Sequence, residues 1–554
     1  MKKCRYNLDI GGKRFMKHFK RLFSYLVALT MVLSMATFAG VNVHADNGYK
    51  IILNNASDKV TTKDHTYHAY QIFSGDLKVN KDDSGKETSK VLSNIQWGTG
   101  IDSSKTSDLI NALKKDREIG SKFNDANDAA SVAKALEDAT SKEVDKFAEI
   151  VNEYLSDTSK SSSGNAETNK TEITGLSAGY YLVKDSLDTD TEGNVKNKSD
   201  VYSKYIVDVV GDTEATIKSD VPTVEKKVKD TNDSTGATSG WQDSADYDIG
   251  DSVPYQITGT MPANIADYTT YKYTFTDTMS KGLTYTAGNA KITIDGTDVT
   301  LSFTETVKTN DDKSTTVTWS CDNLKRIEGV NLTADSKVVV TYSAKLNEGA
   351  VIGAAGNLNK VDLTYSNNPN KNGEGDTGKT PEDKNIVFTY KTVVNKLDQD
   401  QKPLAGAGFT LRKLVKKDDG TTEYKDVKTI AAAEDKTTFE FSGLDDGNYK
   451  LTETTTPAGY NTITPIEFTI SAEHEEKSAD PQLTKFSGNV TSGEAEFTVS
   501  KDAGSLTTDV INKKGSTLPS TGGMGTTLLY VAGGILVACA AAYVIINRKK
   551  SAKK

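Results

Sequence analysis

Cysteine is nearly absent from this chain, which has three cysteines in 554 residues. Cys4 lies in a basic N-terminal segment and Cys539 in an apolar stretch near the C-terminus, so only Cys321 remains in the polar body of the chain. A single cysteine excludes an internal disulfide in that body. If the chain is secreted, its stability outside the cell must come from another source.

The motifs of common enzyme chemistry are also missing. The sequence has no GxSxG, CxxC, HExxH or Walker-type loop, and its five histidines form no convincing cluster: His18, His44, His65, His68 and His474. We expect His65 and His68 to lie at the surface near the start of a strand. Asp311-Asp312 and Asp418-Asp419-Gly420 offer carboxylates for calcium but are typical of turns. We therefore expect no enzyme with turnover, no cofactor and no metal site.

The N-terminal segment has the layout of a secretory signal peptide. Eight basic residues precede an apolar run from Leu22 to about Val43, and Val43-His44-Ala45 closes it as a small-x-small site. We expect cleavage after Ala45, which removes residues 1–45.

The C-terminal segment combines three parts in order. The pentapeptide Leu518-Pro519-Ser520-Thr521-Gly522 precedes an apolar stretch, Thr526 to Ile546, and a basic tail with Arg548, Lys549, Lys550, Lys553 and Lys554. The stretch is long enough to cross a bilayer, and the tail marks a cytoplasmic end. The segment resembles the cell-wall sorting signal of Gram-positive surface proteins, in which a sortase cleaves between Thr and Gly. An ordinary membrane anchor would leave the pentapeptide unexplained.

The mature chain, Asp46 to Thr521, is more acidic than the full sequence. Removing both ends takes away thirteen basic residues and one acidic residue, so the formal charge moves from −9 to −21. This charge argues against nucleic acid or anionic lipid as a partner and favours a soluble surface.

The mature sequence has the composition of strands. Proline is sparse, and alternation recurs in segments such as Val338-Val339-Val340-Thr341-Tyr342 and Phe439-Glu440-Phe441. This pattern predicts an all-β protein of tandem immunoglobulin-like sandwiches. We expect three domains, at 46–220, 221–385 and 386–515, followed by the sorting signal at 516–554. Helical spacing between about Lys105 and Leu155 predicts a helical insertion in the first domain.

The third domain carries specific motifs, from about Val387 to Lys513. They are Val393-Val394-Asn395-Lys396-Leu397-Asp398, Leu404 to Leu411, Tyr449-Lys450-Leu451-Thr452-Glu453-Thr454 and Asp509-Val510-Ile511-Asn512. They resemble the Cna B-type domain of Gram-positive adhesins and pilins, in which a lysine condenses with an asparagine while a buried glutamate assists. The resemblance implies a Lys396–Asn512 isopeptide bond assisted by Glu453.

Burial makes this chemistry reasonable, because it lowers the pKa of an amine and raises that of a carboxyl group. Alternation places Lys396 and Glu453 on the same strand faces as apolar neighbours. A plain buried ion pair between Lys396 and Glu453 is the alternative.

The middle domain resembles the Cna A-type domain of Spa-type backbone pilins. Val224, Lys226 and Val228 alternate on its first strand, Asp277 follows Phe275, and Asn359 opens a late strand. The resemblance implies a Lys226–Asn359 bond assisted by Asp277. Lys227, Asn357, Asp248 and Asp251 remain alternatives, as does the absence of any crosslink.

The first domain ends in a similar pattern, Gly175 to Asp185, but Lys184-Asp185 stands where a glutamate is expected. We predict no crosslink there.

Together these features resemble a Spa-type major (backbone) pilin. The resemblance implies a covalent homopolymer built by a pilus-specific sortase, tip and basal pilins as partners, and attachment to peptidoglycan by a housekeeping sortase. The lysine that joins subunits is assigned to Lys218, with Lys204 and Lys196 as alternatives, although the usual Tyr-Pro-Lys-Asn context is absent. A wall-anchored monomeric adhesin and an accessory basal pilin are the alternative functions.

Overall fold

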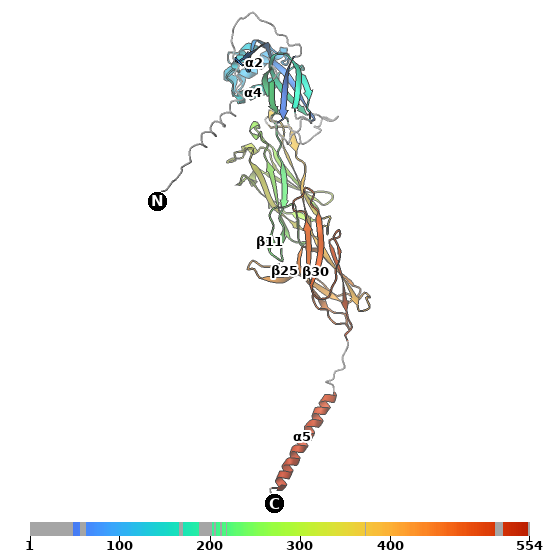
Figure 1. Ribbon diagram of the computed structural model, residues 1–554. Helices are drawn as coiled ribbons and strands as arrows, with labels where there is room; N and C mark the ends of the chain where they lie inside the picture. The colour runs from blue at the N-terminus through green and yellow to red at the C-terminus, as the bar shows by residue number, and fades with distance from the viewer. Residues whose placement is uncertain are drawn as a thin grey trace, which may run out of the picture.

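The computed structural model describes residues 48–55, 63–165, 170–187, 202–203, 206–210, 213–217, 219–371, 373–515 and 524–551. Three β-rich units follow one another along an elongated molecule, and a separate helix lies beyond the third unit (Figure 1). The all-β fold and the helical insertion predicted from the sequence are confirmed.

The first unit has two sheets. Their orders are β5-β1-β8 and β3-β2-β6-β7, with β4 beside β2. The strands are β1 (Tyr49–Asn55), β2 (His65–Lys81), β3 (Glu87–Trp97), β4 (Lys160–Ser163), β5 (Lys170–Leu176), β6 (Gly179–Leu187), β7 (Ile206–Val210) and β8 (Thr213–Ile217).

The helical insertion lies between β3 and β4. It contains η1 (Ser103–Lys105), α2 (Thr106–Lys115), η2 (Gly120–Phe123), α3 (Ala129–Ala135) and α4 (Ser141–Asn152). Helix α4 starts at a capping box in which Thr140 and Glu143 satisfy each other's backbone N–H groups. Leu109, Leu113, Phe147 and Val151 are buried, as their helical spacing predicts.

The middle unit is a sandwich of two larger sheets. One has the order β12-β23-β21-β14-β19-β18, with β22 beside β21, and the other has the order β17-β16-β20-β13-β9, with β15 beside β20. The strands are β9 (Val224–Val228), β10 (Thr231–Asn232), β11 (Ala237–Thr238), β12 (Ser244–Asp246), β13 (Ser252–Thr260), β14 (Tyr273–Met279), β15 (Leu283–Tyr285), β16 (Lys291–Ile294), β17 (Thr297–Asp298), β18 (Thr304–Thr309), β19 (Thr315–Cys321), β20 (Lys337–Leu346), β21 (Asn357–Ser366), β22 (Thr377–Lys379) and β23 (Asp383–Phe388). Its short 3-10 helices are η3 (Ile265–Asp267), η4 (Thr300–Ser302), η5 (Leu324–Arg326) and η6 (Pro369–Lys371).

The third unit has sheets of order β27-β24-β32-β31 and β26-β25-β28-β29-β30. Its strands are β24 (Tyr390–Asp398), β25 (Gly408–Lys416), β26 (Thr422–Ile430), β27 (Thr438–Leu444), β28 (Gly447–Thr455), β29 (Ile466–His474), β30 (Leu483–Ser492), β31 (Thr498–Ser500) and β32 (Ser505–Asn512). The first strand, β24, and the last, β32, are parallel neighbours.

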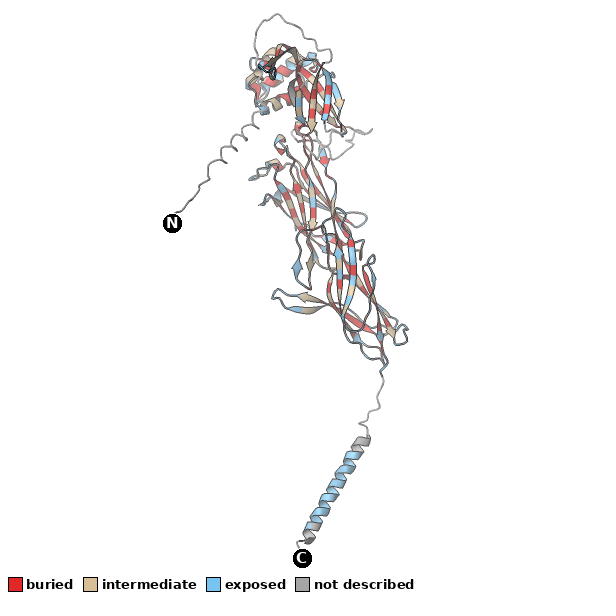
Figure 2. Ribbon diagram, viewed as in Figure 1, coloured by how far each residue is buried: buried red, intermediate tan, exposed pale blue. Residues whose placement is uncertain are grey.

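Buried and partly buried residues alternate along the strands that face these cores (Figure 2). The middle core is rich in aromatic side chains, including Tyr255, Phe275 and Trp319, which are at most 1% exposed. Aromatic side chains bury large apolar areas, so they contribute strongly to the stability of this core.

The middle and third units are in direct contact. The Ile249 N–H donates to the carbonyl of Gly443 at 3.0 Å, and Ser234 Oγ of the β10–β11 turn donates to the carbonyl of Leu414 at 2.8 Å. Gly443 has a φ of +78°, and a Cβ there would lie 2.5 Å from the Ile249 side chain. Only glycine permits both the backbone conformation and this approach.

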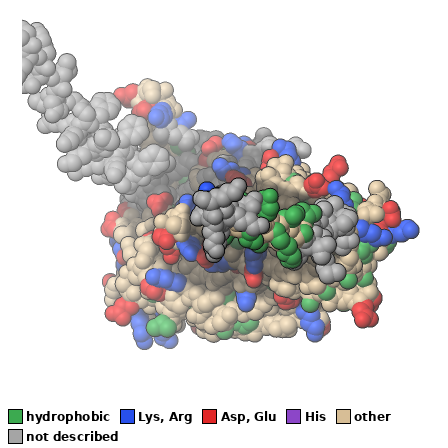
Figure 3. All heavy atoms as spheres, turned by 90° about the horizontal axis from the view of Figure 1, so that it is seen from below, with side chains coloured by type: hydrophobic (Ala, Val, Ile, Leu, Met, Phe, Trp, Pro, Cys, Tyr) green, Lys and Arg blue, Asp and Glu red, His purple; other side chains and the backbone are tan. Residues whose placement is uncertain are grey.

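The last described element is α5 (Met524–Ser551). Its segment Leu529–Ile546 has a mean hydropathy of 2.3 and buries none of its surface against the rest of the chain. The described part of this segment is coloured as exposed in Figure 2. The rest of the molecule, seen from below in Figure 3, shows acidic and basic side chains interspersed on its surface. Length and composition allow this helix to cross a membrane.

Candidate crosslink sites

The middle unit brings its three predicted site residues together inside the sandwich. Lys226 comes from β9 in one sheet, while Asp277 of β14 and Asn359 of β21 come from the facing sheet. All three side chains are 0% exposed. Asp277 pairs with Val361 and Met279 pairs with Asn359, so the carboxyl and the carboxamide are diagonal neighbours on one face.

The hydroxyl of Tyr342, on β20, joins these three groups. It accepts hydrogen bonds from Lys226 Nζ at 2.6 Å and Asn359 Nδ2 at 2.9 Å, and it donates to Asp277 Oδ2 at 2.8 Å. Lys226 Nζ also donates directly to Asp277 Oδ2. The sequence analysis missed Tyr342, because the alternation in Val338–Tyr342 predicts which side chains face inward but not which of them meet.

Burial is the dominant electrostatic effect at this site. It lowers the pKa of Lys226 and raises the pKa of Asp277, while the attraction between the two charges opposes both shifts. The Lys226 ammonium would lie 5.1 Å from the ring centroids of both Tyr255 and Tyr342, which gives modest cation–π compensation. Burial therefore acts toward the uncharged forms of both groups, a neutral amine and a protonated carboxyl group, against the mutual attraction of their charges.

The alternative residues in the middle unit have other partners. Lys227 is partly exposed and pairs with Asp243 at 2.6 Å. Asn357 is held by the backbone of Val351 and Val387. Asp248 lies at the junction with the third unit, where it contacts Lys413.

Asp251, the other alternative acid, also lies at that junction. Its Oδ2 accepts a hydrogen bond from the Asp248 N–H at 3.2 Å, and its backbone bonds with that of Leu346. This arrangement places it outside the Lys226 cluster.

One further asparagine lies beside the middle site. Asn385 of β23 is directly opposite Asn359 in the β21–β23 register and is 0% exposed. Within the described part of the chain, neither polar atom of its side chain has a hydrogen-bond partner. Its side chain therefore borders the cluster of Lys226, Asp277 and Asn359, and no hydrogen bond within the described residues fixes it.

The third unit places its predicted residues differently. Lys396 pairs with Val510 across parallel strands β24 and β32, and Asn512 is two residues further along, on the same face. Both side chains are 0% exposed. Glu453 comes from β28 in the facing sheet and accepts a hydrogen bond from Asn512 Nδ2 at 2.9 Å. A bond here would join neighbouring strands of one sheet, whereas a bond in the middle unit would join two sheets.

Among the described residues, the Lys396 amine is held by backbone carbonyls and not by a direct ion pair. Its Nζ donates to the carbonyls of Leu397 and Val510, both at 2.9 Å. Burial lowers the pKa of Lys396 to about 8, although the charges of Glu453 and Asp398 act in the opposite direction. The second oxygen of Glu453 accepts from the Ile463 N–H at 3.0 Å, so the carboxyl group is fixed toward Asn512.

The first unit has a different arrangement at the corresponding position. Asp185 accepts from the Ser203 N–H at 2.8 Å and lies 3.0 Å from His65 Nδ1. The expectation that His65 lies at the surface is wrong, because it is 1% exposed. Its position on the inward face of β2, opposite Leu187, explains the burial.

The predicted sorting and polymerisation residues lie outside the described residues. This applies to Leu518, Pro519, Ser520, Thr521 and Gly522, to Lys218, and to the alternatives Lys204 and Lys196.

Comparison with known families identifies the second and third units. A model of the Gram-positive pilin backbone subunit 2, Cna-B-like domain, matches residues 249–369, and a SpaA prealbumin-like fold domain matches residues 391–485. The first match includes Asp277 and Asn359, and the second includes Lys396 and Glu453.

Two individual proteins are also similar. The trypsin-resistant surface T6 protein of Streptococcus pyogenes serotype M6 is 28% identical over 297 residues, which are 49% of this chain and 49% of that protein. The chain thus spans about half the length of this relative. The solved T6 backbone pilin of serotype M6 S. pyogenes, described as a modular three-domain structure, superposes with a TM-score of 0.51 at 15% identity. That match covers 86% of this chain and all of the other. Residues 249–369 and 391–485 therefore match domains of the Gram-positive pilin backbone and SpaA families, and the chain shares the fold of the solved T6 pilin.

Proposed function

We propose that this chain is the structural backbone subunit of a covalent, sortase-assembled pilus. The match of the pilin backbone model to residues 249–369 carries this proposal. Three sandwiches in a row, with an apolar helix beyond the last, suit a rod-shaped subunit that is held at the membrane before its transfer. Secretion through the signal peptide and attachment to the peptidoglycan of the cell wall are part of the same proposal.

Each crosslink would form by internal condensation. The neutral amine of Lys226 attacks the side-chain carbonyl carbon of Asn359, and a new C–N bond replaces the bond to the amide nitrogen. The protonated Asp277 delivers its proton to the departing nitrogen, which leaves as ammonia, and then takes up a proton from the attacking amine. No other reactant is needed, because the atoms of lysine and asparagine balance those of the isopeptide and ammonia.

In the third unit, Lys396, Asn512 and Glu453 take the same roles. Fixed positions replace an encounter in solution, which gives a high effective concentration of amine at the amide. Each reaction occurs once per chain, so the protein is not an enzyme with turnover.

Polymerisation would use the C-terminal pentapeptide and an exposed lysine. A pilus-specific sortase cleaves after Thr521 and transfers its carbonyl to Lys218 of the next copy of the chain. Tip and basal pilins join the ends of the polymer, and a housekeeping sortase attaches the base to peptidoglycan.

Denaturing gels of wall extracts test this function. We expect a ladder of covalent multimers that disappears in a Lys218→Ala variant while the folded monomer stays on the wall. A Thr521→Ala variant should lose both the polymer and wall attachment. A single sharp band from the parent chain would instead indicate an anchored monomeric adhesin. A ladder that persists in Lys218→Ala would move the linkage to another lysine, such as Lys204 or Lys196.

A further inference from the structure

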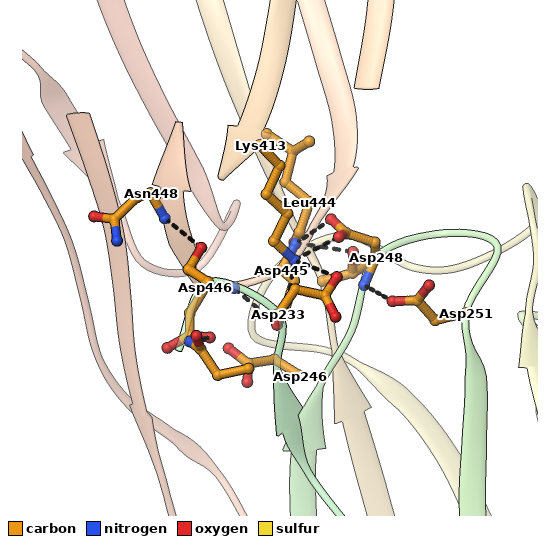
Figure 4. Close-up of polar contacts among 12 residues, drawn as sticks. Asp233, Asp246, Asp248, Asp251, Lys413, Leu444, Asp445, Asp446 and Asn448 are labelled. Carbon is orange, nitrogen blue, oxygen red and sulfur yellow. Dashed lines mark hydrogen bonds and ion pairs between the residues drawn. The ribbon is translucent and has the colours of Figure 1, made fainter. Parts of the chain in front are cut away.

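The junction between the middle and third units buries an excess of carboxylates (Figure 4). The middle unit contributes Asp230, Asp233, Asp246 and Asp248, and the turn between β27 and β28 contributes Asp445 and Asp446. Within the described part of the chain, the ion pairs of these six carboxylates are made by two basic residues, Lys413 and His474.

One half of this cluster already has its cation. Lys413 Nζ donates to Asp233 at 3.2 Å, to Asp248 at 2.5 Å and to Asp445 Oδ2 at 3.0 Å. Burial lowers the pKa of Lys413, but the charges of these carboxylates outweigh burial and raise it above its ordinary value. This half is a neutralised ion-pair network that ties the two units together.

The other half has carboxylates without a comparable cation. Oxygen atoms of Asp246, Asp445 and Asp446 lie within 4.8 Å of one another, on the side of Asp445 that faces away from Lys413 (Figure 4). Asp445 shares Lys413 with the first half, and the basic group beside Asp246 is His474, whose Nε2 lies 3.7 Å from Asp246 Oδ1 and 3.8 Å from Asp230 Oδ2.

Two buried polar atoms beside these oxygens lack partners, which points to a missing ligand. Asp246 is 2% exposed, and its Oδ2 has no hydrogen-bond partner among the residues that the structure describes. The Tyr390 hydroxyl, which is 0% exposed, also has no hydrogen-bond partner among the described residues. Burial raises the pKa of this hydroxyl, and the Asp246 carboxyl group that it faces raises it further, although the two groups do not have the geometry of a hydrogen bond. Buried polar atoms are rarely left without a partner, so a group bound between them would account for both.

Either protons or a cation can neutralise such a cluster. A divalent cation neutralises two carboxylates at once and allows all three to stay ionised. Three carboxylates without sulfur or nitrogen suit a hard ion such as Ca²⁺, which takes oxygen ligands in flexible geometry.

We propose that Asp246, Asp445 and Asp446 bind one calcium ion at the junction of the middle and third units. Asp246 is the last residue of β12 and pairs with Phe388 of β23 in the middle unit, whereas the other two ligands belong to the third unit. The ion therefore links the units and limits bending at their joint. This inference does not depend on polymerisation or on the isopeptide bonds, and it departs from the expectation of no metal site.

Calorimetry on the full chain in detergent, after treatment with EDTA, tests the proposal. We expect one Ca²⁺ to bind per chain and the melting temperature to rise with Ca²⁺ until the site is saturated. Asp246→Asn should weaken calcium binding by about tenfold or more, because it removes one anionic ligand. In EDTA the same variant should melt no lower than the parent chain, since it also removes a repelling charge.

Matched variants separate this site from general effects of charge. Asp419→Asn, in an exposed turn, should respond to Ca²⁺ like the parent chain. If Asp246→Asn does not fold, Asp446→Asn should show the same loss of binding. The proposal is overturned if the parent neither binds Ca²⁺ nor gains stability up to about 10 mM, above the weak end of extracellular calcium sites. It is also overturned if Asp246→Asn responds like the parent, or if only Zn²⁺ binds, because zinc would favour Asp230, Asp246 and His474 instead.

Discussion

The Tyr342 hydroxyl donates to Asp277 Oδ2 at 2.8 Å while accepting a hydrogen bond from Lys226 Nζ at 2.6 Å. Tyr342 and Asp277 come from opposite sheets, so this bond places the acid beside the amine in the middle of the sandwich. In the described part of the third unit, Glu453 bonds directly to Asn512 without such an intermediary. The middle and third units would therefore support the proposed condensation through two different hydrogen-bond arrangements.

Replacing Tyr342 with Phe should slow the middle crosslink without affecting the other one. The variant removes the hydroxyl that orients Asp277 and Asn359 but keeps the ring that packs against Tyr255. Loss of even one of these positioning hydrogen bonds should reduce the rate by about fivefold, since a typical bond contributes about 1 kcal/mol. Mass spectrometry of newly synthesised chain over time measures the rate. An unchanged rate would show that Tyr342 only packs.

Removing either acid should leave its own domain uncrosslinked and less stable. Asp277→Ala and Glu453→Ala should each reduce the mass deficit, measured against the mass calculated for the variant sequence, by one ammonia, because the amide is then not activated. Each bond closes a loop slightly longer than about 100 residues, for which chain entropy gives a stabilisation of about 4–5 kcal/mol, before any native strain. Thermal unfolding with limited proteolysis should locate each loss in one domain. Loss of both crosslinks from a single substitution would contradict this independence.

The two asparagines of β21 should behave differently. Asn359→Ala should abolish the middle crosslink, because it removes the acceptor amide. Asn357→Ala should retain the crosslink and lose only the hydrogen bonds to Val351 and Val387. Peptide mapping of the crosslinked fragment distinguishes the outcomes. A bond that persists in Asn359→Ala would transfer the acceptor role to Asn357 or to Asn385.

Formation of the third-unit crosslink should accelerate with rising pH. The reacting form of Lys396 is the neutral amine, and burial lowers its pKa to about 8. Below pH 8 the neutral fraction falls about tenfold per pH unit, and above pH 8 it is nearly constant. Chain from cell-free synthesis, transferred to buffers from about pH 6 to pH 9, should follow this curve. A rate that falls with pH across this range would exclude the amine as the group that limits the reaction.

The same shift has a consequence for stability before the bond forms. The pKa of Lys396 is lower in the folded chain than the ordinary value of 10.5, so the unfolded chain binds more protons between these values. Stability of the unreacted domain should therefore rise with pH from about 8 to about 10.5.

The site residues of the third domain could be predicted from the sequence because each of them lies in a short motif on a single strand. The motif around Glu453 lies on one strand, and the alternation of β24 already places Lys396 inward. Their burial is as expected, while formation of the bond between Lys396 and Asn512 remains a prediction.

Residues that meet only through the fold could not be predicted in the same way. Tyr342 reaches Asp277 from the other sheet, and Asn385 lies opposite Asn359 through the pairing of β21 and β23. The junction cluster gathers residues as far apart as Asp230 and Asp446, each of which looks like an ordinary turn or strand-end aspartate in the sequence. His65 was misplaced for a similar reason, because its partner Asp185 lies on another strand.

The most direct test of covalent stabilisation is the intact mass of the soluble part of the chain, residues 46–517. We predict a mass lower than that of the sequence by two ammonia molecules, one for Lys226–Asn359 and one for Lys396–Asn512. A deficit of one ammonia would restrict the chemistry to a single domain. A mass equal to that of the unmodified sequence would contradict the account.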